Sequence, residues 1–310
     1  MTANVLFAGR ADSWPVYGPL LKAECARLGV KADLRNEFAP EEVDYIVYAP
    51  SGPIRDFTPF TRLKAVLSMW AGVEKIVPNA PPSVPLARMV DSGLEQGMTE
   101  WVAGHTLRYH LGMDAHIHGQ NGRWDPRTPP LAKNRSVTVL GLGALGTASA
   151  KALAALGFQV SGWSRSQKEV EGITCHAGPE GLKDALAKAE ILILLLPDTA
   201  ATENTLNADT LGWLPKGAKI INPGRGPLID DDALLGALDR GQVGHATLDV
   251  FRVEPLPPEH PYWAHPNVTV TPHIASETRE STAAEVIAEN IRRGEAGEPL
   301  LHLVDRSLGY

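Results

Sequence analysis

Three short segments of the chain carry side chains that could bind an oxyacid and transfer a proton. Each follows an apolar run, and they contribute Arg225, Glu254 and His273. A planar guanidinium can hold the carboxylate and the adjacent carbonyl oxygen of a 2-keto acid at the same time. Arg225 is flanked by Gly224 and Gly226, which we expect to leave it uncovered. Reduction of the carbonyl creates an alkoxide that needs a proton donor, and His273 is the candidate.

Glu254 is the candidate partner of that histidine. A carboxylate within hydrogen-bonding reach stabilises the protonated form of an imidazole. Each residue alone has an ordinary structural explanation, because strand-end arginines are often surface charges, histidines after proline often cap turns, and glutamates before proline are often only solvated. The three together, in a chain that also has a nucleotide loop, favour a catalytic site. In it Arg225 binds substrate, and His273 with Glu254 acts as acid and base.

A glycine-rich loop follows the β-rich run 136–140 and precedes a helical pattern. This arrangement is typical of a dinucleotide site, because the glycines permit a tight turn, a close approach of the backbone to the pyrophosphate, and close packing of helix on strand. The helix N-terminus then faces the anion. The expected cofactor-binding residues here are Gly141, Gly143, Ala144, Leu145 and Gly146.

The end of the next strand indicates which dinucleotide is bound. A carboxylate there would accept hydrogen bonds from the ribose of NAD(H). This chain instead has hydroxyl and basic side chains, namely Ser164, Arg165, Ser166 and Lys168. These could bind a 2′-phosphate through charge-assisted hydrogen bonds. The sequence therefore predicts NADP(H) as the preferred cofactor and NAD(H) as the second candidate, although Arg165 and Lys168 could also be ordinary solvated loop charges.

Strands and helices alternate along most of the chain, which predicts an α/β protein with parallel sheets. Strands are expected in the first third at 5–8, 44–49, 65–70 and 85–90, with a helix over 19–28. A long helix over 98–118 and a Gly/Pro-rich stretch over 120–130 indicate a crossing between domains. Six further strands are expected at 136–140, 159–163, 191–196, 218–222, 245–250 and 267–272, enough for a doubly wound Rossmann sheet, and a last helix over 277–293.

Composition argues against several classes of function. The 310 residues, 44% of them apolar, are enough for two domains, and the net charge of −7 has no basic cluster that would favour nucleic acid. The longest aliphatic run, 191–196, is too short to span a bilayer, so neither a membrane partner nor a membrane location is expected. Only Cys25 and Cys175 are present, which favours a cytoplasmic protein over a disulfide framework. No metal site is expected from the histidines of 105–118.

Motifs along the whole chain resemble those of the D-2-hydroxyacid dehydrogenase family. They are GLGALG (141–146), NPGRGPLID (222–230), LDVFRVEPLPPEHPYW (248–263) and TPHIAS (271–276). Three further segments are similar to its glyoxylate/hydroxypyruvate reductase A branch, namely MWAGVEKI (69–76), LPDTAATENTL (196–206) and VDRSLGY (304–310). The resemblance implies a smaller, flavodoxin-like substrate domain formed by 1–97 and 277–310, a Rossmann domain over 98–276, and a homodimer built around the crossing helix and the loop with Trp124.

The resemblance also implies further roles for single residues. It implies that Arg225 binds substrate, that Glu254 orients His273, and that the loop of Trp70, Ala71, Gly72 and Val73 offers backbone amides to the substrate carboxylate. The nicotinamide side would be lined by Pro197, Asn222, Asp249, His273 and Ser276. Ser164 departs from the acid common in the family, which supports NADPH, and Trp70 departs from the usual small residue, so that it either shapes the pocket or only packs.

The expected activity is NADPH-dependent reduction of small 2-keto acids such as glyoxylate and hydroxypyruvate. Larger keto acids share the same carboxylate and carbonyl, so the sequence leaves the physiological substrate open. Two alternatives remain at this point. One is a nucleotide-sensing corepressor or scaffold on the same fold, and the other is an oxidoreductase of the formate or phosphite type.

Overall fold

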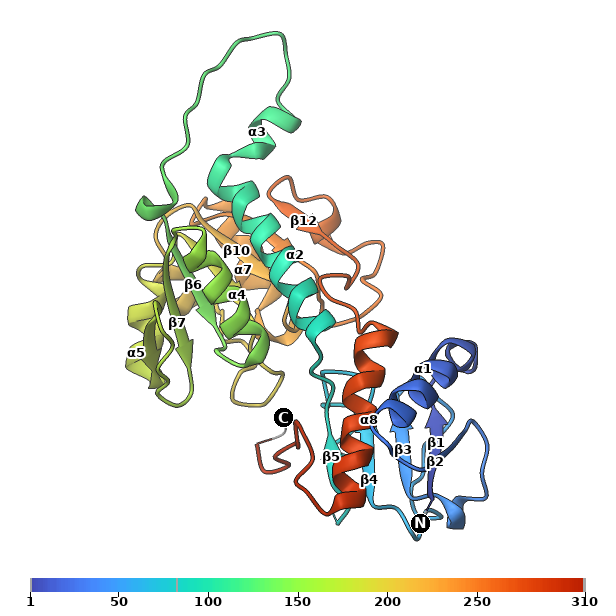
Figure 1. Cartoon of the computed structure of the whole chain (residues 1–310). Coiled ribbons are helices and arrows are strands. Elements are labelled where there is room, and N and C mark those ends of the chain that lie inside the picture. The colour runs from blue at the N-terminus through green and yellow to red at the C-terminus, as the bar shows by residue number, and fades with distance from the viewer. Residues whose placement is uncertain (1, 82, 309–310) are drawn as a thin grey trace. The chain divides into compact units, whose positions relative to one another are not determined.

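A computed structural model describes residues 2–81 and 83–308, and these form two compact units. The first comprises Met1–Leu94 and Thr278–Tyr310, and the second comprises Glu95–Glu277. The sequence predicted the two domain boundaries between residues 97 and 98 and between residues 276 and 277. Figure 1 shows the chain leaving the first unit through helix α2 and returning to it as helix α8.

The first unit is built on a parallel sheet of five strands in the order β2-β1-β3-β4-β5. In chain order the strands are β1 (Ala3–Ala8), β2 (Ala32–Arg35), β3 (Tyr45–Tyr48), β4 (Ala65–Ser68) and β5 (Leu86–Ala87). Helices α1 (Trp14–Arg27) and α8 (Glu280–Ala296) pack together on it through residues such as Leu21, Ile287 and Ile291. This strand order is that of flavodoxin-like folds, which confirms the smaller domain of the predicted fold class.

The second unit is built on a parallel sheet of seven strands in the order β12-β11-β10-β9-β6-β7-β8. The strands are β6 (Ser136–Leu140), β7 (Gln159–Ser164), β8 (Thr174–Ala177), β9 (Ile191–Leu194), β10 (Ala218–Asn222), β11 (Val243–Leu248) and β12 (Val268–Val270). Its helices are α2 (Ser92–Leu111), which begins in the first unit, α3 (Met113–Ile117), α4 (Ala144–Ala155), α5 (Gly178–Leu186), α6 (Ala208–Gly212) and α7 (Asp231–Asp239). Six of the strands follow the order of a doubly wound Rossmann sheet, so the predicted class is confirmed for this unit also.

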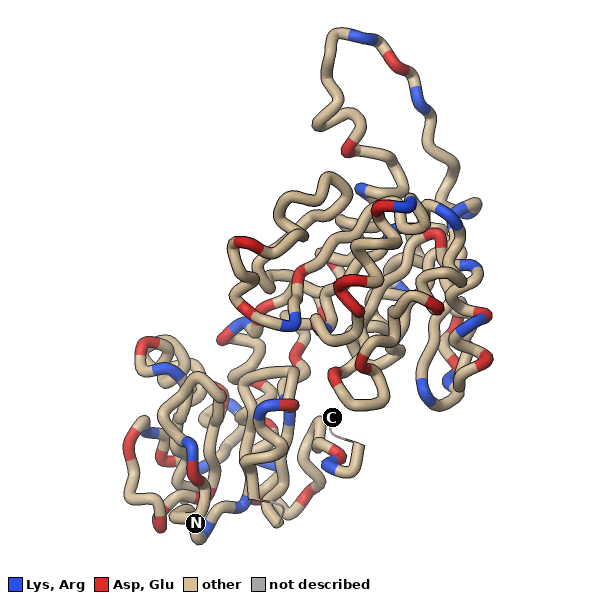
Figure 2. Tube along the Cα trace, turned by 180° about the vertical axis from the view of Figure 1, so that it is seen from behind, with Lys and Arg blue, Asp and Glu red and all other residues tan. Residues whose placement is uncertain are grey.

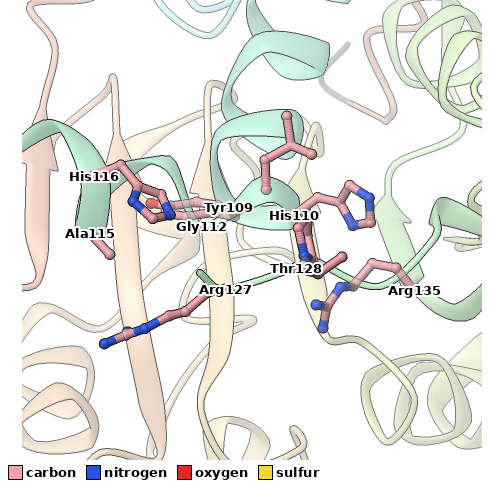
Figure 3. A pocket seen from close by; sticks show the side chains of 10 residues that line it. Tyr109, His110, Gly112, Ala115, His116, Arg127, Thr128 and Arg135 are labelled. Atoms are coloured by element: carbon pink, nitrogen blue, oxygen red, sulfur yellow. The ribbon is translucent and has the colours of Figure 1, made fainter. Parts of the chain in front are cut away.

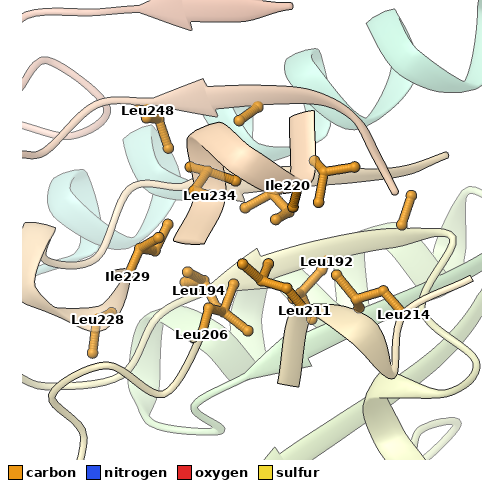
Figure 4. Close-up of a cluster of buried hydrophobic side chains, with 14 of the residues drawn as sticks. Leu192, Leu194, Leu206, Leu211, Leu214, Ile220, Leu228, Ile229, Leu234 and Leu248 are labelled. Atoms are coloured by element: carbon orange, nitrogen blue, oxygen red, sulfur yellow. The ribbon is translucent and has the colours of Figure 1, made fainter. Parts of the chain in front are cut away.

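Both faces of the larger sheet are buried, which explains the unbroken aliphatic run of β9. Leu192 and Leu194 enter one core together with Ile220 (Figure 4), whereas Ile191 and Ile193 enter the core on the opposite face. Successive side chains of a strand point to opposite faces, so a strand covered by helices on both sides must be apolar at every position.

The two strands that sequence analysis missed, β2 and β8, both lie at sheet edges. Each pairs with a single neighbour, and β8 has no buried residue among its four. Edge strands need no continuous apolar pattern, so the sequence signal was weak. The expected helix over 98–118 begins earlier, at Ser92, and is divided at Gly112, whose φ of 63° ends α2 before α3 begins.

The segment after α3 extends away from the body of the second unit (Figure 1). It carries Arg123, Asp125 and Arg127, and basic and acidic colours alternate along it in Figure 2. The side chain of Trp124 is 95% exposed. Elsewhere in this view of the traced chain, acidic and basic residues are interspersed. No helix in the described residues has the length and apolar character needed to cross a membrane.

His245 on β11 links the sheet to helix α2. Its Nε2 lies 2.9 Å from the hydroxyl of Thr269, which also accepts a hydrogen bond from Arg108 Nη2 at 2.9 Å. The Thr269 hydroxyl can therefore donate its proton to an unprotonated His245. Burial and, second to it, the like charge of Arg108 lower the pKa of His245 to about 4.

This environment predicts acid sensitivity of the fold. The unfolded chain binds a proton at His245 near the ordinary value of 6.5, and the folded chain does so only near 4. The stability due to the neutral ring is thus complete above about pH 6.5 and is lost as the pH falls towards 4. The free energy of unfolding, measured by urea titration across this range, should fall less steeply in His245→Gln. The exposed control His118→Gln should keep the wild-type slope, and an unchanged slope in His245→Gln would contradict the assignment.

Candidate active site

The glycine loop joins β6 to α4 as the motif predicts, and each of its glycines has a different structural role. Gly141 has a φ of 105°, and a Cβ on it would lie 2.4 Å from the Leu195 carbonyl oxygen. A Cβ on Gly146 would lie 1.8 Å from the Gly141 oxygen, so helix and loop touch there. A Cβ on Gly143 would meet nothing within 4 Å. The open space lies at Gly143, the residue just before α4, where the backbone could approach a pyrophosphate.

The end of β7 presents the residues predicted to select the cofactor. Ser164 is buried, and its hydroxyl donates to the Ser166 carbonyl at 2.8 Å, so it shapes the turn. Arg165 and Ser166 are exposed. Lys168 reaches back to the glycine loop and donates from Nζ to the Leu142 carbonyl at 2.6 Å. The two segments that would contact the adenosine half of a dinucleotide are therefore tied to each other.

Three neighbouring strands, β10, β11 and β12, end beside one another and carry the predicted catalytic loops. Asn222 ends β10 with 1% exposure, and Asp249, which follows β11, is fully buried. The Asp249 carboxylate accepts three hydrogen bonds, from the Thr271 hydroxyl at 2.6 Å and from the amides of Ile274 and Ala275 at 2.9 Å. Asp249 thus fixes the loop that contains His273.

His273 and Glu254 meet as the sequence predicts. His273 Nδ1 lies 2.8 Å from Glu254 Oε2, and Glu254 Oε1 accepts the amide of Phe251 at 2.9 Å. The His273 backbone has a φ of 55° and donates its amide to the Asp249 carbonyl at 2.9 Å. Its side chain is 49% exposed. Within the described residues Nε2 has no hydrogen-bond partner, so this nitrogen can face a ligand while Nδ1 is held by the carboxylate.

Arg225 lies on the adjacent loop, after β10. The Asn222 side chain fixes this loop by donating to the Arg225 carbonyl at 2.9 Å and accepting the Gly224 amide at 3.1 Å. The flanking glycines were expected to leave Arg225 uncovered, but the structure gives them a packing role. A Cβ on Gly226 would lie 2.0 Å from the carbonyl carbon of Phe251, and one on Gly224 would lie 2.7 Å from the Leu194 oxygen. The arginine loop therefore packs directly on the backbone of the loop that carries Glu254.

Arg252 is a positioning residue that the sequence did not single out. Its guanidinium donates to the Ile229 carbonyl at 2.7 Å from Nη2, and also bonds to the Asn204 side chain. It thereby ties the Glu254 loop to the segment that follows Arg225. A basic residue between Asp249 and Glu254 was visible in the sequence, but its partners come from segments distant along the chain.

The remaining predicted residues lie at other strand ends. Pro197 follows β9, and its carbonyl accepts the Thr202 hydroxyl at 2.6 Å. Ser276 is half-buried on the loop after β12. Trp70, Ala71 and Gly72 belong to the first unit and follow β4. There the Ser68 hydroxyl accepts the Trp70 amide and donates to the Trp70 carbonyl, both at 2.9 Å.

A cavity of about 210 Å³ lies elsewhere, beside α2 and α3. Figure 3 shows His110, His116, Arg127 and Arg135 around it. The described residues contain no group of three or more metal-ligating side chains, here or at the strand ends. Since none of the predicted catalytic residues lines this cavity, the candidate active site is defined by the strand-end loops.

Comparison with known proteins identifies the family. The family model for the NAD binding domain of D-isomer specific 2-hydroxyacid dehydrogenases matches residues 105–275. The chain belongs to the D-isomer specific 2-hydroxyacid dehydrogenase family. Its predicted identity as a member of this family is thereby confirmed.

Individual relatives place the chain near one branch of these dehydrogenases. Glyoxylate/hydroxypyruvate reductase A of Serratia proteamaculans is 42% identical over 257 residues, which cover 80% of this chain and 82% of that protein. A family structure from Xanthobacter autotrophicus, in complex with NADPH and MES, has a TM-score of 0.92 and 42% identity and covers 99% of both chains. An NADPH-dependent glyoxylate/hydroxypyruvate reductase from Sinorhizobium meliloti, in complex with NADP and sulfate, has a TM-score of 0.83 and 33% identity. It covers 100% of this chain and 99% of its own.

The residues of this dehydrogenase fit a dinucleotide. The backbone at Gly143 is open at the start of a 12-residue helix, which provides amide donors and a partial positive charge for a pyrophosphate. No carboxylate occupies positions 164–168, where an acid would repel a 2′-phosphate.

Alanine substitutions in the glycine loop should separate binding from folding. Gly143→Ala should fold normally, because its Cβ meets no protein atom, yet it should raise the Kd for NADPH by intruding on the ligand. Gly146→Ala should lower the melting temperature without ligand, because its Cβ would clash with the Gly141 oxygen. Fluorescence titration with NADPH and a thermal melt measure the two effects. Wild-type NADPH affinity in Gly143→Ala would remove this loop from the cofactor site.

Proposed function

We propose that the protein is an NADPH-dependent reductase of small 2-keto acids, such as glyoxylate and hydroxypyruvate, and forms the corresponding 2-hydroxy acids. The observation that carries the proposal is the contact of 2.8 Å between His273 Nδ1 and Glu254 Oε2, on loops beside the one that holds Arg225. The curated relatives at 40–42% identity, all named glyoxylate/hydroxypyruvate reductase A, support this choice of substrates.

In this proposal His273 protonates the new alkoxide oxygen from Nε2. Glu254 holds Nδ1, which fixes the ring orientation and stabilises the imidazolium before the proton is released. Bound NADPH supplies the hydride that reduces the carbonyl carbon. After turnover His273 regains a proton from solvent, to which its half-exposed side chain has access.

Arg225 is assigned to the substrate's carboxylate and carbonyl oxygens. A guanidinium can donate two parallel hydrogen bonds to such a planar pair and so fixes the carbonyl for attack. The backbone amides of Ala71 and Gly72 are assigned to the same carboxylate, as the family resemblance implies. We assign Pro197, Asn222, Asp249 and Ser276 to the nicotinamide side. Asn222 and Asp249 would act there chiefly by holding their loops, because their side chains are buried and hydrogen-bonded within the protein.

The preferred cofactor is NADP(H), with NAD(H) as the weaker alternative. Three related structures at 32–42% identity contain NADPH or NADP. In this chain Arg165 and Ser166 are exposed at the end of β7, where they could bind a 2′-phosphate. Lys168 is assigned to the same phosphate group, although in the structure its ammonium binds the Leu142 carbonyl. It contributes either directly or by holding the two cofactor loops together.

The protein is further proposed to be a cytoplasmic homodimer. Large apolar side chains are exposed along α2, α3 and the extended segment after them, where Leu111, Met113, Ile117, Trp124 and Leu131 are 40–95% exposed. Such a concentration is typical of a surface that a protein partner covers. Cys25 and Cys175 are both free, which is consistent with a reducing compartment.

A corepressor or scaffold function on the same fold is the principal alternative. It requires nucleotide binding but no acid–base pair, so the geometry of His273 and Glu254 disfavours it. An enzyme of the formate or phosphite type would need a different partner for the histidine. Absence of turnover with NADPH across a panel of 2-keto acids would favour the corepressor function.

Substitutions of the three catalytic candidates should have different kinetic effects. His273→Asn should lower kcat by roughly 10²–10⁴-fold, the usual contribution of a general acid. Glu254→Gln should also lower kcat, because the amide no longer stabilises the charged ring. Arg225→Lys should mainly raise KM, because the ammonium cannot form the two parallel bonds. NADPH oxidation with glyoxylate and hydroxypyruvate measures these effects, and His118→Asn serves as an exposed histidine control. Full activity in any of the three variants would remove that residue from the mechanism.

Cofactor preference should depend on the end of β7. Arg165→Gln should reduce the ratio of kcat/KM for NADPH to that for NADH by roughly 10- to 100-fold, since a charge-assisted hydrogen bond contributes about 1.5–3 kcal/mol. Ser164→Asp should shift the preference in the same direction by introducing a carboxylate. Lys151→Gln removes an equal charge from an exposed position on α4 and should leave the ratio unchanged. An unaltered ratio in both test variants would refute the assignment of the 2′-phosphate site.

A further inference from the structure

A second cavity lies in the larger unit at the edge of the sheet where β6, β9 and β10 begin. The catalytic loops lie at the opposite edge, where the strands end. The cavity has a volume of about 180 Å³. It is lined by Tyr109, Arg135, Glu190, Ile191 and residues 215–219.

Three cationic side chains and a single carboxylate line this cavity. The cations are Arg135, Lys216 and Lys219, and the carboxylate is Glu190. The Glu190 carboxylate already accepts hydrogen bonds from the Ser136 amide at 2.8 Å and from Arg135 Nη1 at 2.6 Å. The lining therefore carries an excess of positive charge.

Several donors of this lining lack acceptors. The ammonium groups of Lys216 and Lys219 form no hydrogen bond or ion pair within residues 2–81 and 83–308, and Lys219 is partly buried. Arg135 Nε is buried and has no acceptor in the same part of the chain. An unsatisfied buried donor costs free energy, and an ionised one costs more. A bound anion would satisfy these groups together.

The electrostatic environment of Lys219 agrees with this geometry. Burial lowers the pKa of its ammonium, the positive charge of Arg135 lowers it further, and the negative charge of Asp114 opposes both. Asp114 forms an ion pair with Arg108 at 2.6 Å, and within the described residues it forms none with Lys219. Lys219 is therefore a cation whose charged form its buried surroundings disfavour.

We propose that this cavity binds a small tetrahedral oxyanion of the phosphate class. Arg135 at the start of β6 and Lys216 and Lys219 around the start of β10 supply donors from two sides. A dianion matches the excess of three cations over one carboxylate. The volume is several times the roughly 30 Å³ that a water molecule occupies in the liquid, so an oxyanion fits with part of its hydration.

The proposed site is separate from the cofactor and catalytic positions. Lys219 is near the start of β10, and Asn222, which supports the Arg225 loop, ends the same strand. Three residues of extended strand separate their Cα atoms by roughly 10 Å. The lining shares no residue with the glycine loop, the end of β7 or the catalytic loops.

Calorimetric titration of inorganic phosphate into the full chain tests the proposal. Saturating NADPH is present so that phosphate cannot occupy the 2′-phosphate position, and ionic strength is held constant with KCl. The wild type should bind one phosphate at this cavity. Lys219→Gln and Lys216→Gln should each weaken binding by at least about tenfold, equivalent to about 1.4 kcal/mol. Lys188→Gln removes a lysine that is exposed and outside the lining, and should bind as the wild type does.

A thermal melt provides a second measurement and checks folding. Without phosphate, Lys219→Gln should melt at or above the wild-type temperature, because a disfavoured charge is removed. Phosphate should raise the melting temperature of the wild type and of Lys188→Gln, but much less that of Lys219→Gln. If Lys219→Gln does not fold, Lys216→Gln, altered at an exposed position, decides the question. Absence of phosphate binding in the wild type, or equal binding in all the variants, would overturn the proposal.

Discussion

The buried carboxylate of Asp249 is the interaction on which the catalytic loops depend. A fully buried carboxylate is tolerated only when hydrogen bonds replace its hydration. Here the hydroxyl of Thr271 and the amides of Ile274 and Ala275 do so, and all three belong to the segment around His273. If the His273 loop moved away, the buried Asp249 carboxylate would lose these hydrogen bonds at a large cost in free energy. The carboxylate therefore holds the loop in its position. It also supports the positive φ of His273, a conformation that costs a residue with a side chain roughly 1–3 kcal/mol.

Close backbone packing also fixes the positions of the neighbouring loops, which carry Arg225 and Glu254. Gly226 leaves no space for a Cβ against Phe251, and Arg252 ties the same loop to the carbonyl of Ile229. The amide of Phe251 in turn holds one oxygen of Glu254. The loops after β10, β11 and β12 thus form one hydrogen-bonded assembly, so their positions are set by the sheet rather than by each loop separately.

In this arrangement the loop backbones are held rigidly, while the catalytic side chains remain accessible to solvent. The carboxylate and amide groups that hold the loops are buried, whereas the side chains of His273 and Glu254 are 49% and 35% exposed. A general acid must be accurately placed and must also reach substrate and solvent. Buried hydrogen bonds hold the backbone of the histidine loop in place, and the imidazole remains accessible to substrate and solvent. Glu254 in addition fixes the orientation of the ring.

The sequence by itself determined the fold class, the glycine loop and the pairing of His273 with Glu254. Those features depend on local patterns, namely alternating strands and helices, glycines at fixed spacing, and polar residues directly after apolar strands. The edge strands β2 and β8 escaped detection because they need no apolar face, and the packing role of Gly224 and Gly226 could not be seen without the opposing backbone. The partners of Arg252, the links from Lys168 to Leu142 and from Asp249 to the His273 loop, and the cationic cavity at Lys219 were decided by tertiary structure alone. Each joins segments far apart in the sequence, and only the order of the strands brings those segments together.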